Sequence, residues 1–228
     1  MTMPMGFHWL GRCATATVLA VGFATMGSAI VNVGDRQSGA WAQSANPTVA
    51  SVVAAIASSP NGQLSPALQA SLATYLNSLP ASQATSFVNS VVSTGGTSGG
   101  AGGAALAGNM VTAMASLPGL SPATQSNVGT GLGQAAGVLA ANGYGGSAKS
   151  ILSNVPAAGP MATGLTNGMA QAIAAIPSAG TALATAAAGT PASTRVATAT
   201  AIAPNITPPA PLVVNPNQVV PCTSGSCN

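Results

Sequence analysis

Between residues 65 and 80, apolar residues recur every three or four positions, which is the spacing of one face of an α-helix. The stripe consists of Leu68, Leu72, Tyr75, Leu76 and Leu79, and Pro80 ends it. A second stripe follows, formed by Phe87, Val88, Val91 and Val92. A capping side chain directly before a proline marks three helix starts, at Asn46–Pro47, Ser65–Pro66 and Ser121–Pro122. The pattern predicts short amphipathic helices that each bury one face.

Parts of this pattern occur twice. VVAAIASSPNGQLSPALQ, from Val52, aligns with MVTAMASLPGLSPATQ, from Met110, when two loop residues are left out. ATSFVNSV, from Ala84, aligns with AKSILSNV, from Ala148, and QAIAAIP, from Gln171, begins a more divergent third copy. Self-similarity on this scale predicts a duplicated unit of short helices.

We therefore expect an all-α fold from about residue 46 to residue 188, built from duplicated short-helix units rich in Ala and Gly. The first unit covers residues 43–94, and the glycine-rich stretch 95–103 is expected to be a flexible linker. The second unit and an alanine-rich helical pair cover residues 104–188.

Residues 189–228 are rich in Pro, Thr and Val and show no helical stripe, so we expect an extended or disordered tail. Four valines make this segment more apolar than an ideal solvated tail. They are Val213, Val214, Val219 and Val220. This composition favours an extended arm that docks on a neighbouring molecule, and plain disorder is the alternative.

The first 42 residues have the pattern of an export signal. A short, weakly positive start ends at Arg12, and residues 13–34 carry no charged side chain. Ala40 and Ala42 then occupy the small-residue positions of a signal-peptidase site, which predicts cleavage before Gln43. The apolar run is close to the length that spans a bilayer, so an uncleaved membrane anchor is the alternative. Its many Ala, Gly and Thr residues favour the signal.

The amino-acid composition argues against several classes of function. Only 2% of the residues are charged, against about 25% in ordinary soluble domains. Cleavage before Gln43 removes Asp35 and His8, so the mature chain keeps no acidic side chain and no histidine. Catalytic triads, paired carboxylates and most metal sites need these groups. We therefore expect no catalytic activity, no cofactor and no metal. The few Lys and Arg residues are scattered, which argues against nucleic acid as a partner.

The stretch NGYGGSAKS, residues 142–150, approaches a phosphate-binding loop, because Gly143 precedes Lys149 and Ser150 at the required distance. The second glycine of such a loop is replaced by Ala148, and the residues before it have a helical pattern. The aligned copy has Ala84, Thr85 and Ser86 here, without a lysine. We interpret the stretch as a glycine-rich turn into a helix and expect no nucleotide binding. A Ser/Lys dyad with Ser147 or Ser150 is the remaining catalytic alternative.

Cys222 and Cys227 are separated by four residues in PCTSGSC. In an exported chain this spacing favours a local disulfide around a small Ser/Gly loop, and cross-links between molecules are the alternative.

Taken with the near absence of charge, these patterns predict an exported, non-catalytic structural protein. We expect it to assemble with itself, as a filament or surface layer, in the cell envelope or outside the cell. An accessory subunit of a membrane or envelope complex is one alternative, and a module that binds lipid or hydrophobic surfaces is another.

Overall fold

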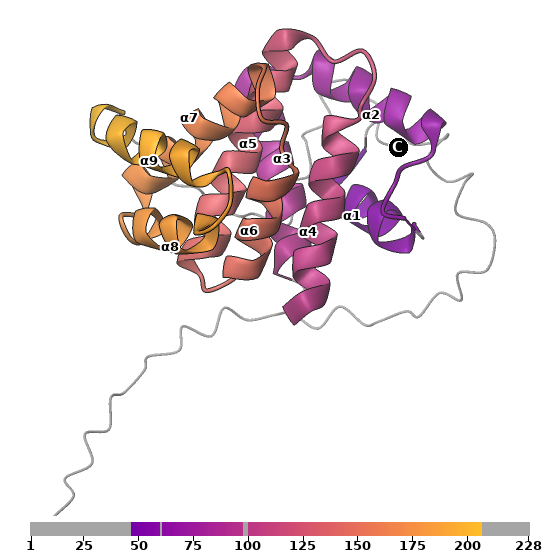
Figure 1. Cartoon of the computed structure of the whole chain (residues 1–228). Coiled ribbons are helices and arrows are strands. Elements are labelled where there is room, and N and C mark those ends of the chain that lie inside the picture. Colours follow the sequence, from indigo (N-terminus) through magenta and orange to yellow (C-terminus); the bar gives the residue numbers. More distant parts are fainter. Residues whose placement is uncertain (1–46, 60, 98–99, 207–228) are drawn as a thin grey trace, which may run out of the picture. The chain divides into compact units, whose positions relative to one another are not determined.

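The computed structural model describes residues 47–59, 61–97 and 100–206. Every regular element in these ranges is helical and none is a β-strand, so the all-α prediction is confirmed for this part of the chain (Figure 1). The elements are α1 (Val49–Ser58), α2 (Pro66–Ser78), α3 (Ala81–Gly96), α4 (Gly100–Ala115), α5 (Pro122–Ala141), α6 (Gly145–Asn154), α7 (Pro160–Ala175), α8 (Ser178–Ala187), α9 (Ser193–Ile202) and the 3-10 helix η2 (Ala203–Asn205).

Two of the three predicted helix starts agree with the structure. Ser65 and Ser121 cap α2 and α5, and a proline follows each cap. The cap predicted for the first helix was wrong, because Thr48 holds that position. Its hydroxyl accepts from the N–H of Ser51, and the Ser51 hydroxyl accepts from the N–H of Thr48, so two free donors are satisfied at once. Asn46 lies outside the described residues.

The aligned segments have matching local structure. In each, a helix leads through a loop to a serine-capped helix and a third helix, as α1–α3 and as α4–α6. A glutamine four residues after the cap donates from its side chain to the carbonyl before the cap in both groups. The bonds join Gln69 to Leu64 over 2.9 Å and Gln125 to Leu120 over 3.1 Å.

The glycine-rich stretch 95–103 differs from the predicted flexible linker. Helix α3 continues to Gly96 and α4 begins at Gly100, so only residues 97–99 separate the two helices. The glycines allow α3 and α4 to approach each other closely. A side chain at Gly95 would overlap Met110, and one at Gly103 would come within 2.8 Å of the Gly96 carbonyl. This carbonyl also accepts a 2.9 Å hydrogen bond from the buried hydroxyl of Ser147.

The expected start of the tail, at residue 189, was wrong. Residues 193–205 form α9 and η2, and both pack against α7. The buried stripe on this segment consists of Ala192, Val196, Ala199 and Ala203. Its spacing is helical, but three of its members are alanines, which contribute little to an apolar pattern. Residues 207–228 lie outside the described part of the chain.

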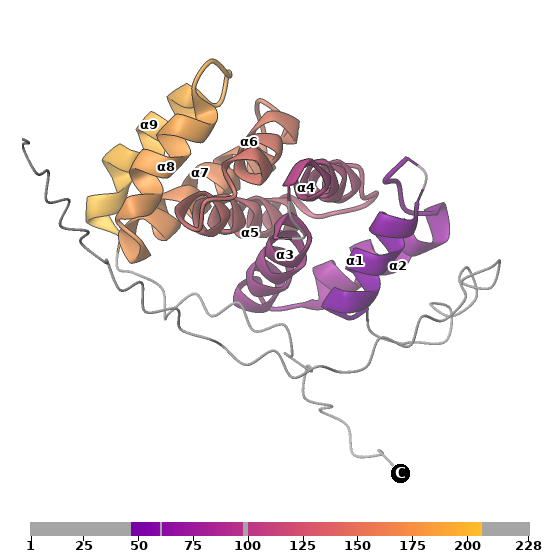
Figure 2. The ribbon, with the colours of Figure 1, turned by 90° about the horizontal axis from the view of Figure 1, so that it is seen from below.

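Helix α5 is the centre of the packing. It contacts α3, α6, α7 and α8, and every residue from 131 to 140 along it is buried. The groups α1–α3 and α7–α9 pack on the central group α4–α6 from different sides (Figure 2). Large side chains from all three groups share one core, including Ile56, Leu76, Met110, Leu132, Leu165 and Leu183.

Among the described helices, α5 and α7 make the most extensive contact. Gly129 and Gly133 on α5 face the carbonyls of Met161 and Leu165 on α7, where a Cβ atom would overlap them. The relation is reciprocal, because Gly164 and Gly168 on α7 face the carbonyls of Ser126 and Thr130. The two backbones therefore touch, a geometry in which Cα–H groups can contact carbonyl oxygens. The sequence GTGLG, residues 129–133, thus serves helix packing.

Candidate functional site

Most of the sequence-predicted site residues lie outside the described residues. They are the cleavage-site residues Ala40, Ala42 and Gln43, the tail valines Val213, Val214, Val219 and Val220, and the cysteines Cys222 and Cys227. The predictions attached to these residues remain predictions. Among the described helices, none is long and apolar enough to cross a membrane.

The Lys149 segment follows a helix and enters another, as the sequence predicts. The N–H of Tyr144 donates to the Leu139 carbonyl over 2.8 Å, and the N–H of Gly143 donates to the Ala140 carbonyl over 3.1 Å. These bonds close the end of α5, with Gly143 at a φ of 87°. A phosphate loop needs such N–H groups for its ligand. In this turn the N–H groups of Gly143 and Tyr144 are used by the end of α5.

The side chains of the segment point to different surroundings. Ser147 is buried and bonded to the carbonyl of Gly96, whereas Lys149 is exposed on α6. Ser150 is half-buried, close to Gly108 of α4. The structure therefore does not bring Lys149 and the Ser147 hydroxyl together in a dyad.

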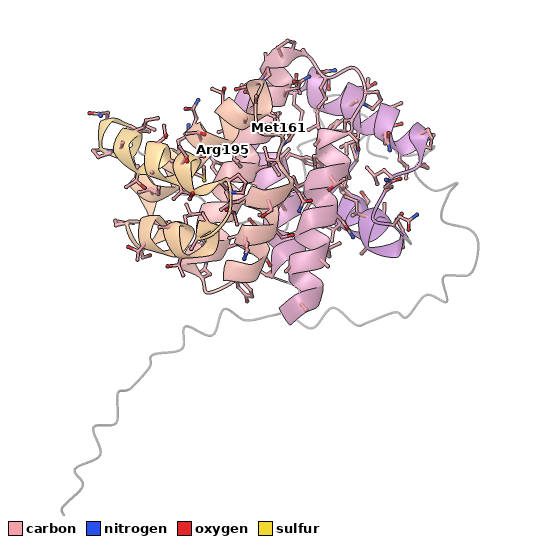
Figure 3. All side chains as sticks on the ribbon, in the orientation of Figure 1. Met161 and Arg195 are labelled. Carbon is pink, nitrogen blue, oxygen red and sulfur yellow. The ribbon has the colours of Figure 1, made fainter. Side chains whose placement is uncertain are left out.

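Few described side chains can carry charge. Lys149 and Arg195 are the cations between residues 47 and 206, and the described residues contain no group of His, Cys, Asp or Glu that could hold a metal. Arg195 is half-buried, and its Nη1 donates to the Pro156 carbonyl over 3.5 Å. Figure 3 marks Arg195 on α9 and Met161 in the first turn of α7, the helix against which α9 packs.

Tyr75 on α2 is a buried polar group. Its side chain is 7% exposed, and its ring meets that of Phe87 edge to face with centroids 5.4 Å apart. The hydroxyl has no hydrogen-bond partner among the described residues. Burial raises the pKa of this hydroxyl above its ordinary value of 10.0. In the alignment of the two groups, Gly131 of α5 corresponds to Tyr75. A Cβ atom added at Gly131 would lie 2.6 Å from the carbonyl oxygen of Thr85 on α3.

The exposed surface has a uniform chemistry. No Leu, Ile, Val, Met or Phe side chain of the described residues is exposed, since each is buried or half-buried. The exposed positions hold mainly Ala, Ser, Thr, Asn, Gln, Gly and Pro. The surface of these helices is therefore made of small, uncharged side chains.

One part of this surface has a repeated pattern that sequence analysis missed. TALATAAA, residues 181–188, and TRVATATA, residues 194–201, share Thr, Ala, Thr and Ala at their first, fourth, fifth and eighth positions. All eight of these residues are exposed. They lie on the packed neighbours α8 and α9, except Ala188, which is the C-cap residue of α8. We call them the α8–α9 face. The recurrence of Thr and Ala at the same spacing in residues 181–188 and 194–201 is the sequence signal that would have revealed this pattern.

The comparisons with known proteins give no relative. No protein-family model, curated protein or solved structure matches this chain.

Proposed function

We propose that this chain is an exported, non-catalytic structural protein that assembles with further copies of itself in the cell envelope or outside the cell. The observation that carries the proposal is the surface of the described helices, which combines small side chains with only two cations, Lys149 and Arg195.

Such a surface lowers two costs of association. Alanine and glycine lose no side-chain rotamers when they are buried, and Thr and Ser lose few. Nearly uncharged partners also avoid the like-charge repulsion that keeps many proteins apart. The α5–α7 contact illustrates how closely small residues let helices of this chain approach.

The distribution of apolar side chains favours association of small surfaces over insertion into lipid. Lipid-binding helices present large apolar side chains to the bilayer, and the described helices keep theirs buried or half-buried. We also infer that α1–α3 and α4–α6 are copies of one duplicated unit, because their caps and glutamine bonds coincide. We propose residues 207–228 as the arm that joins copies, because a segment so rich in proline favours an extended backbone.

Sedimentation of the mature protein tests this proposal. We expect oligomers or filaments that persist from low to high salt, because few charges are available for screening. Deletion of residues 208–228 should shift the distribution towards monomer. A chain that stays monomeric at high concentration, with an unchanged profile after the deletion, would contradict the proposal. Co-purification with one envelope complex would indicate an accessory subunit instead, and co-sedimentation with lipid vesicles would indicate a lipid-binding module.

A further inference from the structure

We propose that Asn61 is a site of spontaneous covalent modification, at which the side-chain carboxamide is converted to a carboxylate in the loop between α1 and α2. The chain contains three Asn–Gly pairs, Asn61–Gly62, Asn142–Gly143 and Asn167–Gly168. A glycine after asparagine favours this reaction, because no side chain hinders the approach of the glycine nitrogen to the carboxamide. The structure separates the three pairs and assigns the reaction to the first. The inference does not depend on the proposed function.

The reaction consumes one water molecule and releases one molecule of ammonia. The backbone nitrogen of Gly62 attacks Cγ of Asn61, and Nδ2 leaves as ammonia with the proton from the Gly62 N–H. Water then opens the resulting succinimide ring. Cleavage of the new bond to Cγ leaves aspartate, whereas cleavage of the original bond to the backbone carbonyl carbon leaves isoaspartate, with the chain continuing through Cγ. No enzyme or cofactor is needed.

The surroundings of Asn61 leave its carboxamide free to react. Asn61 is exposed, and its side chain forms no hydrogen bond with the described residues. The N–H of Gly62 donates to the Ser59 carbonyl over 3.0 Å, and this bond must open before the nitrogen can attack. It lies in a loop between two helices. Loops open locally at a lower free energy than the interior of a packed helix.

The carboxamide of Asn142 is held in place at the end of α5. Its Nδ2 donates to the Val138 carbonyl over 2.8 Å, and the backbone N–H of Asn142 donates to the same carbonyl over 3.1 Å. The N–H of Gly143 donates to the Ala140 carbonyl over 3.1 Å. Both reacting groups of this pair are therefore bonded to the last turn of α5, and several bonds must break together before they can meet.

The third pair lies inside α7. Asn167 is exposed, but Gly168 is buried and faces the Thr130 carbonyl of α5. Turning the Gly168 nitrogen towards the Asn167 side chain would distort α7 where its backbone touches that of α5. We therefore expect this pair to react only when α7 separates from α5, which requires opening of the core.

The modification changes the charge of the described surface by a large fraction. Lys149 and Arg195 are the charged side chains between residues 47 and 206, so two cations less one new carboxylate leave a formal charge of +1. Gly62 also packs against the Asn109 side chain of α4. The longer backbone of an isoaspartate at residue 61 would therefore displace this loop from α4. Ion-exchange chromatography of the intact protein can separate the modified chain from the original.

Incubation of the folded protein at mildly alkaline pH tests the site. Peptide mass spectrometry follows conversion of the carboxamide to a carboxylate at each of the three pairs. We expect conversion at Asn61 to be at least several-fold faster than at Asn142 and Asn167. Equal or faster conversion at Asn142 would overturn the proposal, as would an unmodified Asn61 in a folded sample whose unfolded counterpart reacts.

The same incubation in concentrated urea is the control for local sequence. We expect the three pairs to react at similar rates in the unfolded chain, because each then has only its own Asn–Gly sequence to set the rate. A preference for Asn61 that persists in urea would contradict the structural assignment. Asn61→Gln should remove the early acidic form of the folded protein on ion exchange, whereas Asn142→Gln should leave it unchanged.

Discussion

At the scale of single residues, glycine sets how closely α5 and α7 approach. Gly133 and Gly168 each face a carbonyl of the other helix, so an added methyl group would collide with backbone. Backbone cannot move aside as a flexible side chain can. Glycine is unfavourable inside a helix. These two glycines are explained by the close contact between α5 and α7, which leaves no space for a side chain.

Gly133→Ala is therefore expected to lower the free energy of unfolding by about 3 kcal/mol, the upper range for overpacking. Gly102→Ala is the matched control, because no atom lies within 4 Å of the added methyl group in α4. There we expect an increase of about 0.5–1 kcal/mol, because alanine is more favourable than glycine within a helix. Urea unfolding followed by circular dichroism measures both changes. Similar values for the two variants would show that the α5–α7 contact tolerates a side chain.

The buried hydroxyl of Tyr75 predicts a pH dependence. Burial raises its pKa in the folded chain above the ordinary value of 10.0, so the unfolded chain loses the proton first as the pH rises. The contribution of this group to stability is complete below about pH 9 and is lost as the pH rises through 10 and beyond. Tyr75→Phe should remove this part of the alkaline decline.

At neutral pH the same substitution should change stability little, because the hydroxyl has no partner to lose among the described residues. Tyr144→Phe is the control, and its stability should still fall at alkaline pH as that of the unchanged protein does. The test is to measure the free energy of unfolding of both variants across the alkaline range. An unaltered decline in Tyr75→Phe would assign it to other groups.

At the scale of elements, helix starts were the most predictable features. Ser65 and Ser121 cap their helices because a short hydroxyl side chain can reach a free N–H of the first turn. Thr48 was missed because the preceding Asn46–Pro47 pair offers the same sequence signal. The reciprocal bonds between Thr48 and Ser51 decide the start of α1.

Ser121→Ala should lower the free energy of unfolding by about 1 kcal/mol, as loss of a helix cap does. The effect of Ser65→Ala should be smaller, since its capping contact is 3.5 Å long, against 3.1 Å at Ser121. Ser71→Ala, at an exposed position within α2, is the control and should be neutral or slightly stabilising. Thermal and urea unfolding of the three variants test the order. A larger loss from Ser71→Ala would exclude capping as the cause.

At the scale of the whole molecule, the prediction that concerns most residues is processing. The apolar run and the Ala40–Ala42 pattern predict cleavage before Gln43. Intact-mass analysis of the exported protein should show a chain that begins at Gln43, directly or as pyroglutamate. A mature chain that still contains residues 1–34 would support the membrane anchor instead.

The sequence by itself determined the helical class, the caps of α2 and α5, and the apolar faces of α2 and α3, because spacing and capping act within a few residues. It also located the turn between α5 and α6, because the glycine-rich residues 143–146 follow one helical pattern and lead into the helix that carries Lys149. Tertiary structure decided the rest. The stretch 95–103 became mostly helical because its glycines admit neighbouring side chains and backbone, and α9 formed because alanines that look neutral in sequence fit against α7. The α8–α9 face likewise exists only because packing buries the other sides of both helices, which leaves their threonines and alanines outside.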